Sequence, residues 1–574
     1  MTDLQTYNQP TKVAVRKASL THAVELLTSR REAAAVVPED HVRRIRASLL
    51  ESDTYGDANA ARQCSDADIE SWQRFRAQAV GTREPSEITV AYFAGPEPSN
   101  DLLTLLDLGL RPENIWAFEV EASAIASGLN DLEKLRLRGV KFIPVSIEQY
   151  FVGTPRRFDI IYIDACAPLP SYGQRTTRLI ADIFRSSALS PLGVLITNFA
   201  KPDISQQNEL NRYSHLVASY LYPKGFIESE SGGMIEGPPV YGFVLPCDSE
   251  DQSDGSAEDD CDQCFLEEVA SNFERYYGSF ITRHVMDIAA IIAPMMRFVG
   301  SGLHKVLFDG SPLAAAERAR RFVRFNPLFL SDDYDPNADD DLDLDGDAAS
   351  DPSFFSLLWA LDNCGLYESE QNSATPDADT RKLEHRWVNQ LAGSQPSGLK
   401  PEEAIAAFYT LRHDKAFWSP AMRKIADFPY RAKMPFLCDV PTEEIGFYPA
   451  FAQLAYPAHA NVREAKRFRY IAEGKTTEMF TDVLPFDECR YVFDWLSALH
   501  LVPEDWSDLS AQLTFRFALD AIVKNGRWFW DDFLYGCHVV GISSAFPAGE
   551  LEPRINFSKE PGGRAEAGHE KPED

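Results

Sequence analysis

Short apolar runs alternate with amphipathic stretches between residues 88 and 199, and this alternation constrains the fold more than any other feature of the sequence. The apolar runs are ITVAYF (88–93), IWAFE (115–119), VKFIPV (140–145), FDIIYID (158–164) and LGVLITNF (192–199). The stretches between them, at 99–110, 121–137 and 175–189, repeat apolar residues with the spacing of a helix face. Continuous apolar strands that alternate with helices predict a parallel sheet covered by helices on both faces.

A pair of strands is expected after this region. A further helix is predicted at 208–221, and it is followed by GFIESES (225–231) and PPVYGFVLP (238–246), with two glycines between them. That pattern is typical of an antiparallel pair, which here would close the sheet. The expected fold class is therefore α/β, a Rossmann-like, mostly parallel seven-stranded sheet with helical N-terminal and C-terminal regions.

The chain has 574 residues, which is more than one hydrophobic core usually organises, so several domains are expected. Helical periodicity dominates the first 80 residues and most of the second half, and the final stretch, SKEPGGRAEAGHEKPED, has a disordered composition. We expect a helical N-terminal region (1–84), a Rossmann domain (85–247), an acidic linker (248–264), a helical segment (265–330), an acidic loop (331–352), a mainly helical C-terminal domain (353–545) and a disordered tail (546–574).

The chain is an acidic protein with a formal net charge of −31, and much of this charge is concentrated in two runs. Residues 248–262 carry eight acids and no base, and residues 332–351 carry ten acids and no base. Such runs are suited to contact a basic partner. Nucleic-acid binding usually requires a block of Lys and Arg, which is absent, so the charge argues against a nucleic-acid substrate. The alternative is a local groove at 467–496, where arginines interleave with aromatics, although helical core packing is the expected role of that segment.

The sequence also indicates where the protein resides. No apolar run reaches the ~20 residues of a membrane span, and the first residues, MTDLQTYNQP, lack a secretory pattern. The nine cysteines are odd in number and scattered, which fits reduced thiols better than a disulfide framework. We therefore expect a soluble cytoplasmic protein with no membrane partner.

Polar residues and a glycine stand where the predicted strands end. In an open parallel sheet, ligands bind outside the carboxyl ends of the strands. Gly95 lies in the loop after the first strand, and Ser99 is placed to cap the helix that follows. Glu119 ends the second strand, about twenty residues on, where an acid accepts hydrogen bonds from both ribose hydroxyls in dinucleotide sites. Ser146 follows the third strand at the expected adenine edge, and Asp164 ends the fourth.

The order, spacing and strand-end acids of residues 87–246 resemble those of class I S-adenosylmethionine-dependent methyltransferases. This resemblance implies S-adenosylmethionine as the cofactor, with the loop after the first strand near its methionine moiety and Asp164 beside the reacting methyl group. The implied cofactor-binding residues are Ala94, Gly95, Pro96, Glu119, Ser146, Ile147 and Asp164, and the implied catalytic residues are Asp164 and Asn198, the latter at the end of the fifth strand.

The predicted function is a methyltransferase, and the large flanking regions favour a macromolecular acceptor, either RNA or protein. The alternative is a non-catalytic methyltransferase-like binding or scaffold protein, because Pro96 and Pro98 stand where the family usually has small residues. An NAD-dependent enzyme is a third possibility, which the single glycine of the loop disfavours because pyrophosphate needs a close backbone approach.

Other motifs are weaker. Cys261 and Cys264 have the spacing of a zinc half-site without a second pair, and DLDLDGD (341–347) opens like a calcium loop but lacks its final glutamate. No metal site is predicted from them. Cys166 follows the fourth strand, near the cysteine of cytosine-carbon methylating enzymes, but no partner cysteine accompanies the fifth strand, so covalent cytosine chemistry is not expected.

Overall fold

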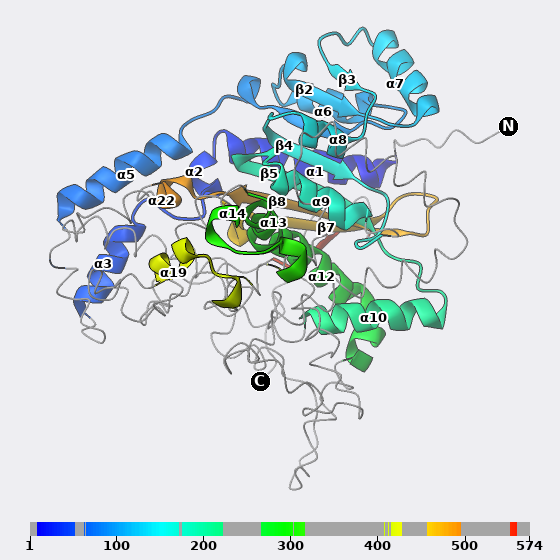
Figure 1. Cartoon of the computed structure of the whole chain (residues 1–574). Helices are drawn as coiled ribbons and strands as arrows, with labels where there is room; N and C mark the ends of the chain where they lie inside the picture. The colour runs from blue at the N-terminus through cyan, green and yellow to red at the C-terminus, as the bar shows by residue number, and fades with distance from the viewer. Residues whose placement is uncertain are drawn as a thin grey trace, which may run out of the picture.

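The computed structural model (Figure 1) describes residues 9–51, 62, 65–171, 175–221, 266–301, 304–315, 404, 407, 411, 415–426, 456–494 and 552–558. Within them, nine strands form one sheet in the order β3-β2-β1-β4-β5-β8-β7-β9, with β6 paired to β8. The strands are β1 (Val90–Phe93), β2 (Ile115–Phe118), β3 (Lys141–Ile143), β4 (Phe158–Asp164), β5 (Leu189–Ala200), β6 (His459–Ala460), β7 (Lys466–Ile471), β8 (Glu478–Asp487) and β9 (Ile555–Asn556).

The first five strands form the parallel part of the sheet. β1 lies between β2 and β4, and every pairing from β3 to β5 is parallel. All five coincide with the apolar runs predicted from the sequence, and helices connect them. The predicted α/β fold is therefore confirmed, and the parallel pairing of these strands is consistent with a Rossmann-like sheet, but the sheet in the described residues is mixed and has nine strands rather than the seven expected.

The strand beside β5 is not the one predicted. The predicted hairpin at 225–246 lies outside the described residues, and the place next to β5 is taken by β8, which runs antiparallel to it over nine residue pairs. β7 then pairs antiparallel with β8, so it runs in the same direction as β5. The register sets Asn198 opposite Thr481, whose hydroxyl bonds to it across 283 residues of chain. Local sequence pattern carries no information on a pairing at such separation.

Two expectations for the C-terminal half are corrected by these strands. The segment 466–487, which was expected to belong to a mainly helical domain, forms β7 and β8 of the central sheet. Its aromatic residues Phe468, Tyr470 and Phe480 are buried, so they are not available to stack on bases. Residues 552–558, expected within a disordered tail, include β9, which pairs with β7. The other domain boundaries stay predictions.

Helices surround the sheet. The described α-helices are α1 (Pro10–Leu27), α2 (Arg31–Ala34), α3 (His41–Glu51), α5 (Asp66–Val80), α6 (Ser99–Asp107), α7 (Ala122–Lys134), α8 (Ile147–Gly153), α9 (Arg175–Arg185), α10 (Gln207–Leu221), α12 (Phe273–Asp287), α13 (Ala293–Val299), α14 (His304–Leu307), α19 (Pro420–Ala426) and α22 (Arg490–Phe493). A π-helical turn, η6 (Ile288–Ile292), joins α12 to α13. Short 3₁₀ turns are η1 (Pro85–Glu87), η2 (Pro112–Asn114), η9 (Lys415–Phe417) and η11 (Val462–Glu464).

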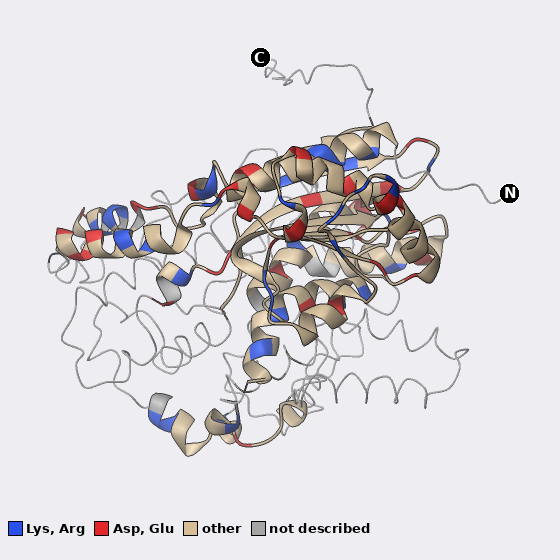
Figure 2. Cartoon of the chain, turned by 90° about the horizontal axis from the view of Figure 1, so that it is seen from above, with Lys and Arg blue, Asp and Glu red and all other residues tan. Residues whose placement is uncertain are grey.

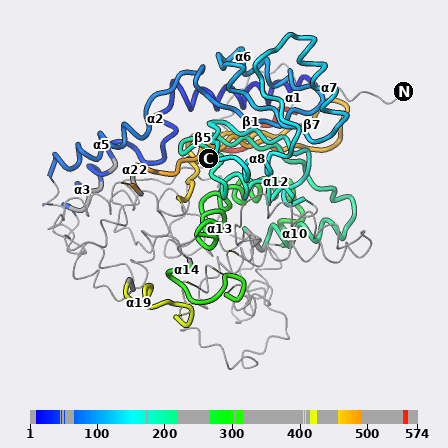
Figure 3. Tube along the Cα trace, turned by 45° about the horizontal axis from the view of Figure 1, so that its top comes forward, coloured from blue at the N-terminus to red at the C-terminus, as the bar shows by residue number. Residues whose placement is uncertain are grey.

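Alternate side chains of the strands point into two separate cores, one on each face of the sheet. Tyr92 and Ile160 pack into the core that contains α1 and α6, whereas Ala91 and Ile161 pack into the core that contains α9, α12 and α13. The period of two along each strand produces this division, because neighbouring side chains point to opposite faces. Helix α1 runs along one face of the sheet beside β7, while α3 and α5 extend from one end of it (Figure 3).

Local signals explain where the N-terminal helices begin. Pro10 is the first residue of α1, a position where the missing N–H of proline costs nothing. Ser65 caps α5, and Asp68 completes the capping box by accepting the Ser65 backbone N–H at 2.9 Å. The helical N-terminal region expected from periodicity is therefore present in the described part of residues 1–84.

One continuous helical stretch from Phe273 to Val299 is long and apolar enough to span a membrane by composition, which the sequence analysis did not anticipate. Its most apolar window is 100% buried inside the protein, against α9 and β6 among others. A mainly apolar helix that is buried on all sides is expected in the centre of a large core. The segment is therefore a core helix of this structure, although its length and composition would also suit a membrane helix.

Charged residues of both signs are mixed along the described helices. Figure 2 shows Lys and Arg positions interspersed with Asp and Glu positions along the ribbon.

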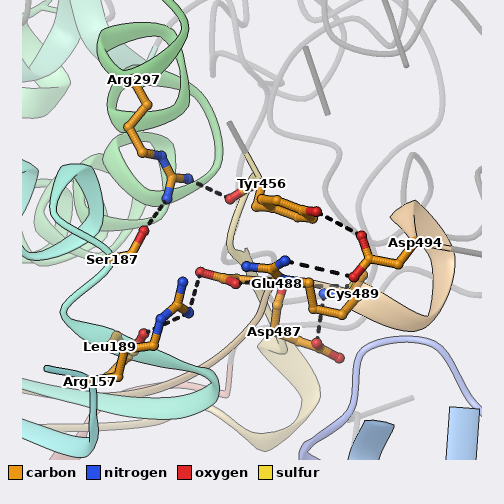
Figure 4. A network of polar contacts seen from close by, with 10 residues as sticks. Arg157, Ser187, Leu189, Arg297, Tyr456, Asp487, Glu488, Cys489 and Asp494 are labelled. Carbon is orange, nitrogen blue, oxygen red and sulfur yellow. Dashed lines mark hydrogen bonds and ion pairs between the residues drawn. The ribbon is translucent and has the colours of Figure 1, made fainter. Parts of the chain in front are cut away.

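The end of β8 is fastened to the start of the parallel strands by a network of arginines around one carboxylate (Figure 4). Glu488 is 5% exposed, and it accepts hydrogen bonds from Arg157, which precedes β4, at 3.0 Å and from Arg490 at 2.9 Å. Arg297 of α13 donates to the carbonyl of Tyr456 at 2.6 Å. Burial lowers the pKa of Arg297 to about 10, and the positive charges of Arg157 and Arg490 add to this, whereas Glu488 opposes it. Glu488 is therefore the counter-charge that these three arginines share.

We predict that Glu488→Gln lowers the free energy of unfolding by about 1–3 kcal/mol, because charged hydrogen bonds to a buried carboxylate are lost and the arginines keep their charge. Urea denaturation at pH 7 measures this loss. The matched control is Glu70→Gln, on the exposed side of α5, which should change the unfolding free energy by less than about 0.5 kcal/mol. Equal effects of the two substitutions would contradict a role for the network.

Candidate functional site

A cleft of about 340 Å³ lies at the carboxyl ends of β1, β2, β3 and β4. This is where ligands bind in open parallel sheets, and the volume is within the usual range for small-molecule sites. All seven residues predicted to hold a cofactor line it. The lining residues are Lys12, Arg16, Phe93, Ala94, Gly95, Pro96, Glu97, Asn100, Asp101, Phe118, Glu119, Val120, Val145, Ser146, Ile147, Glu148, Asp164 and Cys166.

The loop after β1 approaches the cleft through its backbone. Ala94 extends the strand by donating its N–H to the carbonyl of Phe118 at 2.9 Å. Gly95 then adopts a φ of +58°, which L-residues with a side chain rarely adopt. A Cβ at this position would meet no atom within 4 Å, so glycine is needed for the turn and not for lack of space. The turn leaves the backbone of the loop open to the cleft.

The helix that follows this loop is capped differently from the prediction. Ser99 is the first residue of α6 and provides no side-chain cap; its backbone N–H is bound instead by the Asp131 carboxylate of α7 at 3.0 Å. Because an internal anion already occupies this helix start, the site is poorly suited to a pyrophosphate, which would need the same N–H groups.

The second strand ends in a carboxylate held at a fixed angle. Oε1 of Glu119 accepts the backbone N–H of Val120 at 2.7 Å and of Glu121 at 2.9 Å. Among the described residues, none donates a hydrogen bond to Oε2, so this oxygen is available to a ligand in the cleft. A carboxylate oriented in this way can accept two neighbouring hydroxyl groups, as the ribose of a nucleoside provides.

The third strand contributes an apolar wall. Ser146 caps α8 by accepting the N–H of Gln149 at 3.2 Å, and Ile147 is buried behind it. Val120 is 64% exposed and Val145 is 39% exposed, and both line the cleft. Exposed valines on the wall of a cleft offer apolar contact to a flat ring.

Asp164, at the end of β4, has hydrogen-bond partners on both oxygens. Oδ1 accepts the side-chain amide of Asn198 at 2.8 Å and the thiol of Cys166 at 3.3 Å. Oδ2 forms an ion pair with Nζ of Lys12 at 2.7 Å. This carboxylate is therefore oriented and neutralised by protein groups.

Asn198 lies behind Asp164 and does not line the cleft. It is 1% exposed, and its amide also donates to the hydroxyl of Tyr470 at 3.0 Å while its oxygen accepts from Thr481 at 2.8 Å. Its predicted role as a catalytic residue is therefore not supported by its position. It is a positioning residue, which links Asp164 to β7 and β8.

Two residues that sequence reasoning missed come from the N-terminal helix. Lys12 and Arg16 of α1 are 8% and 4% exposed, and both line the cleft. Nε of Arg16 lies 2.7 Å from Oδ1 of Asp101, an ion pair without the angles of a good hydrogen bond. Their spacing of four residues places both cations on one face of α1, but the same spacing is found in exposed charged pairs, so the sequence does not mark them as cleft residues.

The two ion pairs control the ionisation of the cleft. Burial alone would lower the pKa of Lys12 and raise that of Asp164, but their mutual attraction outweighs it: the pKa of Lys12 is raised and that of Asp164 is lowered. The Cys166 thiol is exposed, but partial desolvation beside the cleft wall, followed by repulsion from Asp164, raises its pKa. A raised pKa favours the thiol over the more nucleophilic thiolate.

Metal binding finds no support in the described part of the chain. No group of three or more His, Cys, Asp or Glu residues there is arranged to hold an ion. The cysteine pair at 261–264 and the acidic run at 341–347 lie outside the described residues.

Comparisons with known proteins give little guidance. No protein-family model matches the chain, and no curated protein matches it. Among solved structures, it is similar to a mutant of MtNAS, a nicotianamine synthase, with 20% sequence identity and a TM-score of 0.16. The match covers 32% of this chain, which spans only 61% of that one. A likeness at this TM-score supports no conclusion about the chemistry of the cleft.

We predict that Lys12→Met lowers the free energy of unfolding at pH 7 by about 2–4 kcal/mol, because it leaves the Asp164 carboxylate buried without its cation. The lowered pKa of Asp164 contributes stability above the ordinary Asp value, and this contribution is lost as the pH falls through the folded-state pKa. In the variant, burial without the cation is expected to raise the pKa of Asp164. Its protonation at acid pH would then remove the energetic cost of the unpaired charge.

The difference in the free energy of unfolding between the variant and the wild type should therefore be smaller at pH 4 than at pH 7. Urea denaturation at both pH values measures it. Lys17→Met, on the exposed side of the same helix, is the control and should have little effect at either pH. A deficit that is constant with pH would argue against the ion pair as its cause.

Proposed function

We propose that this protein is an S-adenosylmethionine-dependent methyltransferase that acts on a macromolecular acceptor, either RNA or protein. The observation that carries the proposal is the convergence of the Gly95 loop, Glu119, Ser146 and Asp164 on one cleft of suitable volume. The cleft offers a ribose acceptor, an apolar wall for adenine and a charged end, in the order in which an adenosyl amino acid presents its parts.

The sheet supports the same proposal. An antiparallel strand, β8, lies between β5 and β7, which run in the direction of the parallel strands. This arrangement resembles the terminal hairpin of class I methyltransferases, although here the hairpin is formed by residues 466–487. The capped start of α6 disfavours the dinucleotide alternative, because Asp131 holds the N–H of Ser99.

The chemistry would be an in-line displacement at a sulfonium, in which the methyl group leaves sulfur as the acceptor atom forms a bond to it. Such a reaction depends mainly on the positioning of the two reactants. S-adenosylmethionine supplies the methyl group, and the side chains of this chain orient it: Glu119 would hold the ribose, and the valines of the cleft would flank the adenine. Asp164 would orient the acceptor atom or take its proton.

A second candidate is a protein that binds the adenosyl ligand without turnover. It is favoured by the ion pair of Lys12 with Asp164, because a neutralised carboxylate is a weak base. The cytoplasmic location, a basic partner for the acidic runs and the absence of a membrane partner remain parts of the proposal that rest on the sequence.

The enzyme and the binding protein are distinguished by tracing the methyl group. The purified chain is incubated with a cell lysate and methyl-labelled S-adenosylmethionine, and the protein, RNA and small-molecule fractions are counted. Label in the RNA or protein fraction that depends on the added chain supports the proposal. Calorimetric binding of the cofactor without any transfer would favour the second candidate, and label confined to small molecules would contradict a macromolecular acceptor.

We predict that Glu119→Ala weakens the binding of S-adenosylhomocysteine about 10–100-fold, because one or two hydrogen bonds to a charged acceptor are lost. Isothermal titration calorimetry measures the change. The control is Glu113→Ala, an exposed acid before the same strand that does not line the cleft. If both variants bind as tightly as the wild type, Glu119 is not the ribose ligand.

A further inference from the structure

The cleft has two chemically different ends. Glu119, Val120 and Val145 line one end, which suits a nucleoside. The other end contains two buried ion pairs that bridge helix α1 to the sheet domain, Lys12 with Asp164 and Arg16 with Asp101. The first pair neutralises the strand-end acid, whereas the second contains none of the predicted site residues.

The guanidinium of Arg16 has N–H donors that are not used by the described part of the protein. Only its Nε faces Asp101, and among the described residues no protein group accepts a hydrogen bond from Nη1 or Nη2. Of its three nitrogens, Nε alone is both enclosed and without a hydrogen bond, so the two outer nitrogens remain accessible from the cleft that Arg16 lines. A planar fork of two N–H donors matches the two oxygens of a carboxylate.

The carboxylate of Asp101 in α6 is buried without enough hydrogen bonds from the described part of the chain to replace its lost solvation. It is 7% exposed, and its Oδ1 makes no hydrogen bond of good geometry within the described residues. Burial raises the pKa of Asp101 to about 6 even though Arg16 acts to lower it. A second cation in the cleft would therefore be bound favourably by this carboxylate, because a buried anion gains from each additional donor.

Arg16 can bind a carboxylate, and Asp101 beside it can bind a cation. Together they are complementary to a zwitterion, which carries one group of each kind. A phosphate fits less well, because Glu97 and Asp101 flank the loop and the start of α6 is capped by Asp131. A ligand with a neutral end would give Arg16 and Asp101 no new charged partner.

We propose that Arg16 and Asp101 form the recognition site for the zwitterionic α-amino-acid end of an adenosyl ligand, with Arg16 binding the α-carboxylate and Asp101 the α-ammonium group. This inference rests on the proposed function and adds the residues that recognise the amino-acid end of its ligand. It makes the N-terminal helix a part of the binding site.

The test compares two ligands that share a nucleoside thioether. S-adenosylhomocysteine carries the amino-acid end and 5′-methylthioadenosine lacks it. Their dissociation constants are measured by calorimetry on the full chain and on the double variant Arg16→Met/Asp101→Asn, which removes both charges together and so leaves no unpaired ion in the core. The control is Lys17→Met/Asp107→Asn, which removes the same charges from exposed positions of the same two helices.

The double variant should bind S-adenosylhomocysteine about 30–300-fold more weakly, as expected for loss of two charged contacts. It should bind 5′-methylthioadenosine within about threefold of the wild type, because the nucleoside end is untouched. The control should bind both ligands like the wild type. Equal weakening of both ligands in the double variant would overturn the inference while leaving the proposed function standing.

If the wild type binds neither ligand, the proposed function fails and the inference fails with it. Arg16→Lys keeps a positive charge for Asp101 and serves where the double variant does not fold, as judged by circular dichroism. Lysine cannot form the two-pronged contact, so this variant should still lose about tenfold in affinity for S-adenosylhomocysteine and none for 5′-methylthioadenosine. Unchanged affinity of Arg16→Lys for S-adenosylhomocysteine would contradict the carboxylate contact.

Discussion

The antiparallel pairing of β5 with β8 is the constraint on which the cleft depends. It sets Asn198 opposite Thr481, whose hydroxyl bonds to the oxygen of the amide and so turns the amide nitrogen toward Asp164. A slip of one residue would move these polar groups to the other face of the sheet. The carboxylate at the end of β4 is thus oriented by a hairpin that is distant from it in the sequence.

The part of the fold that local pattern specifies was predicted well. Four of the five parallel strands are largely buried, so they appear in the sequence as apolar runs, and the helices between the strands show helical periodicity. The positions of Gly95, Glu119, Ser146 and Asp164 followed from one rule, because parallel strands end at the same edge and their terminal side chains must meet there. The site residues on these strands could therefore be predicted without knowledge of the rest of the chain.

The remaining parts could not be predicted because their conformation is set by distant partners. β8 is buried at almost every position, so it shows no alternation that would separate a strand from a core helix. Lys12 and Arg16 lie on a helix with the spacing of any charged surface pair, and only docking of α1 on the sheet turns them into cleft residues. Asn198 was recognised as a polar strand end, but its burial depends on β7 and β8, whose pairing the sequence did not reveal.

Placing two cations of the cleft on α1 has a thermodynamic consequence. The helix is joined to the sheet domain by the contacts of Lys12 and Arg16 with acids of β4 and α6, and by the bond of Thr11 to Glu473 in the turn between β7 and β8. A ligand that contacts α1 and the strand ends together binds only the docked arrangement, so its binding free energy must add to the stability of docking. In a chain with a net charge of −31, acids of β4 and α6 hold both cations of the cleft in place, and this pairing joins α1 to the strand ends where the ligand would bind.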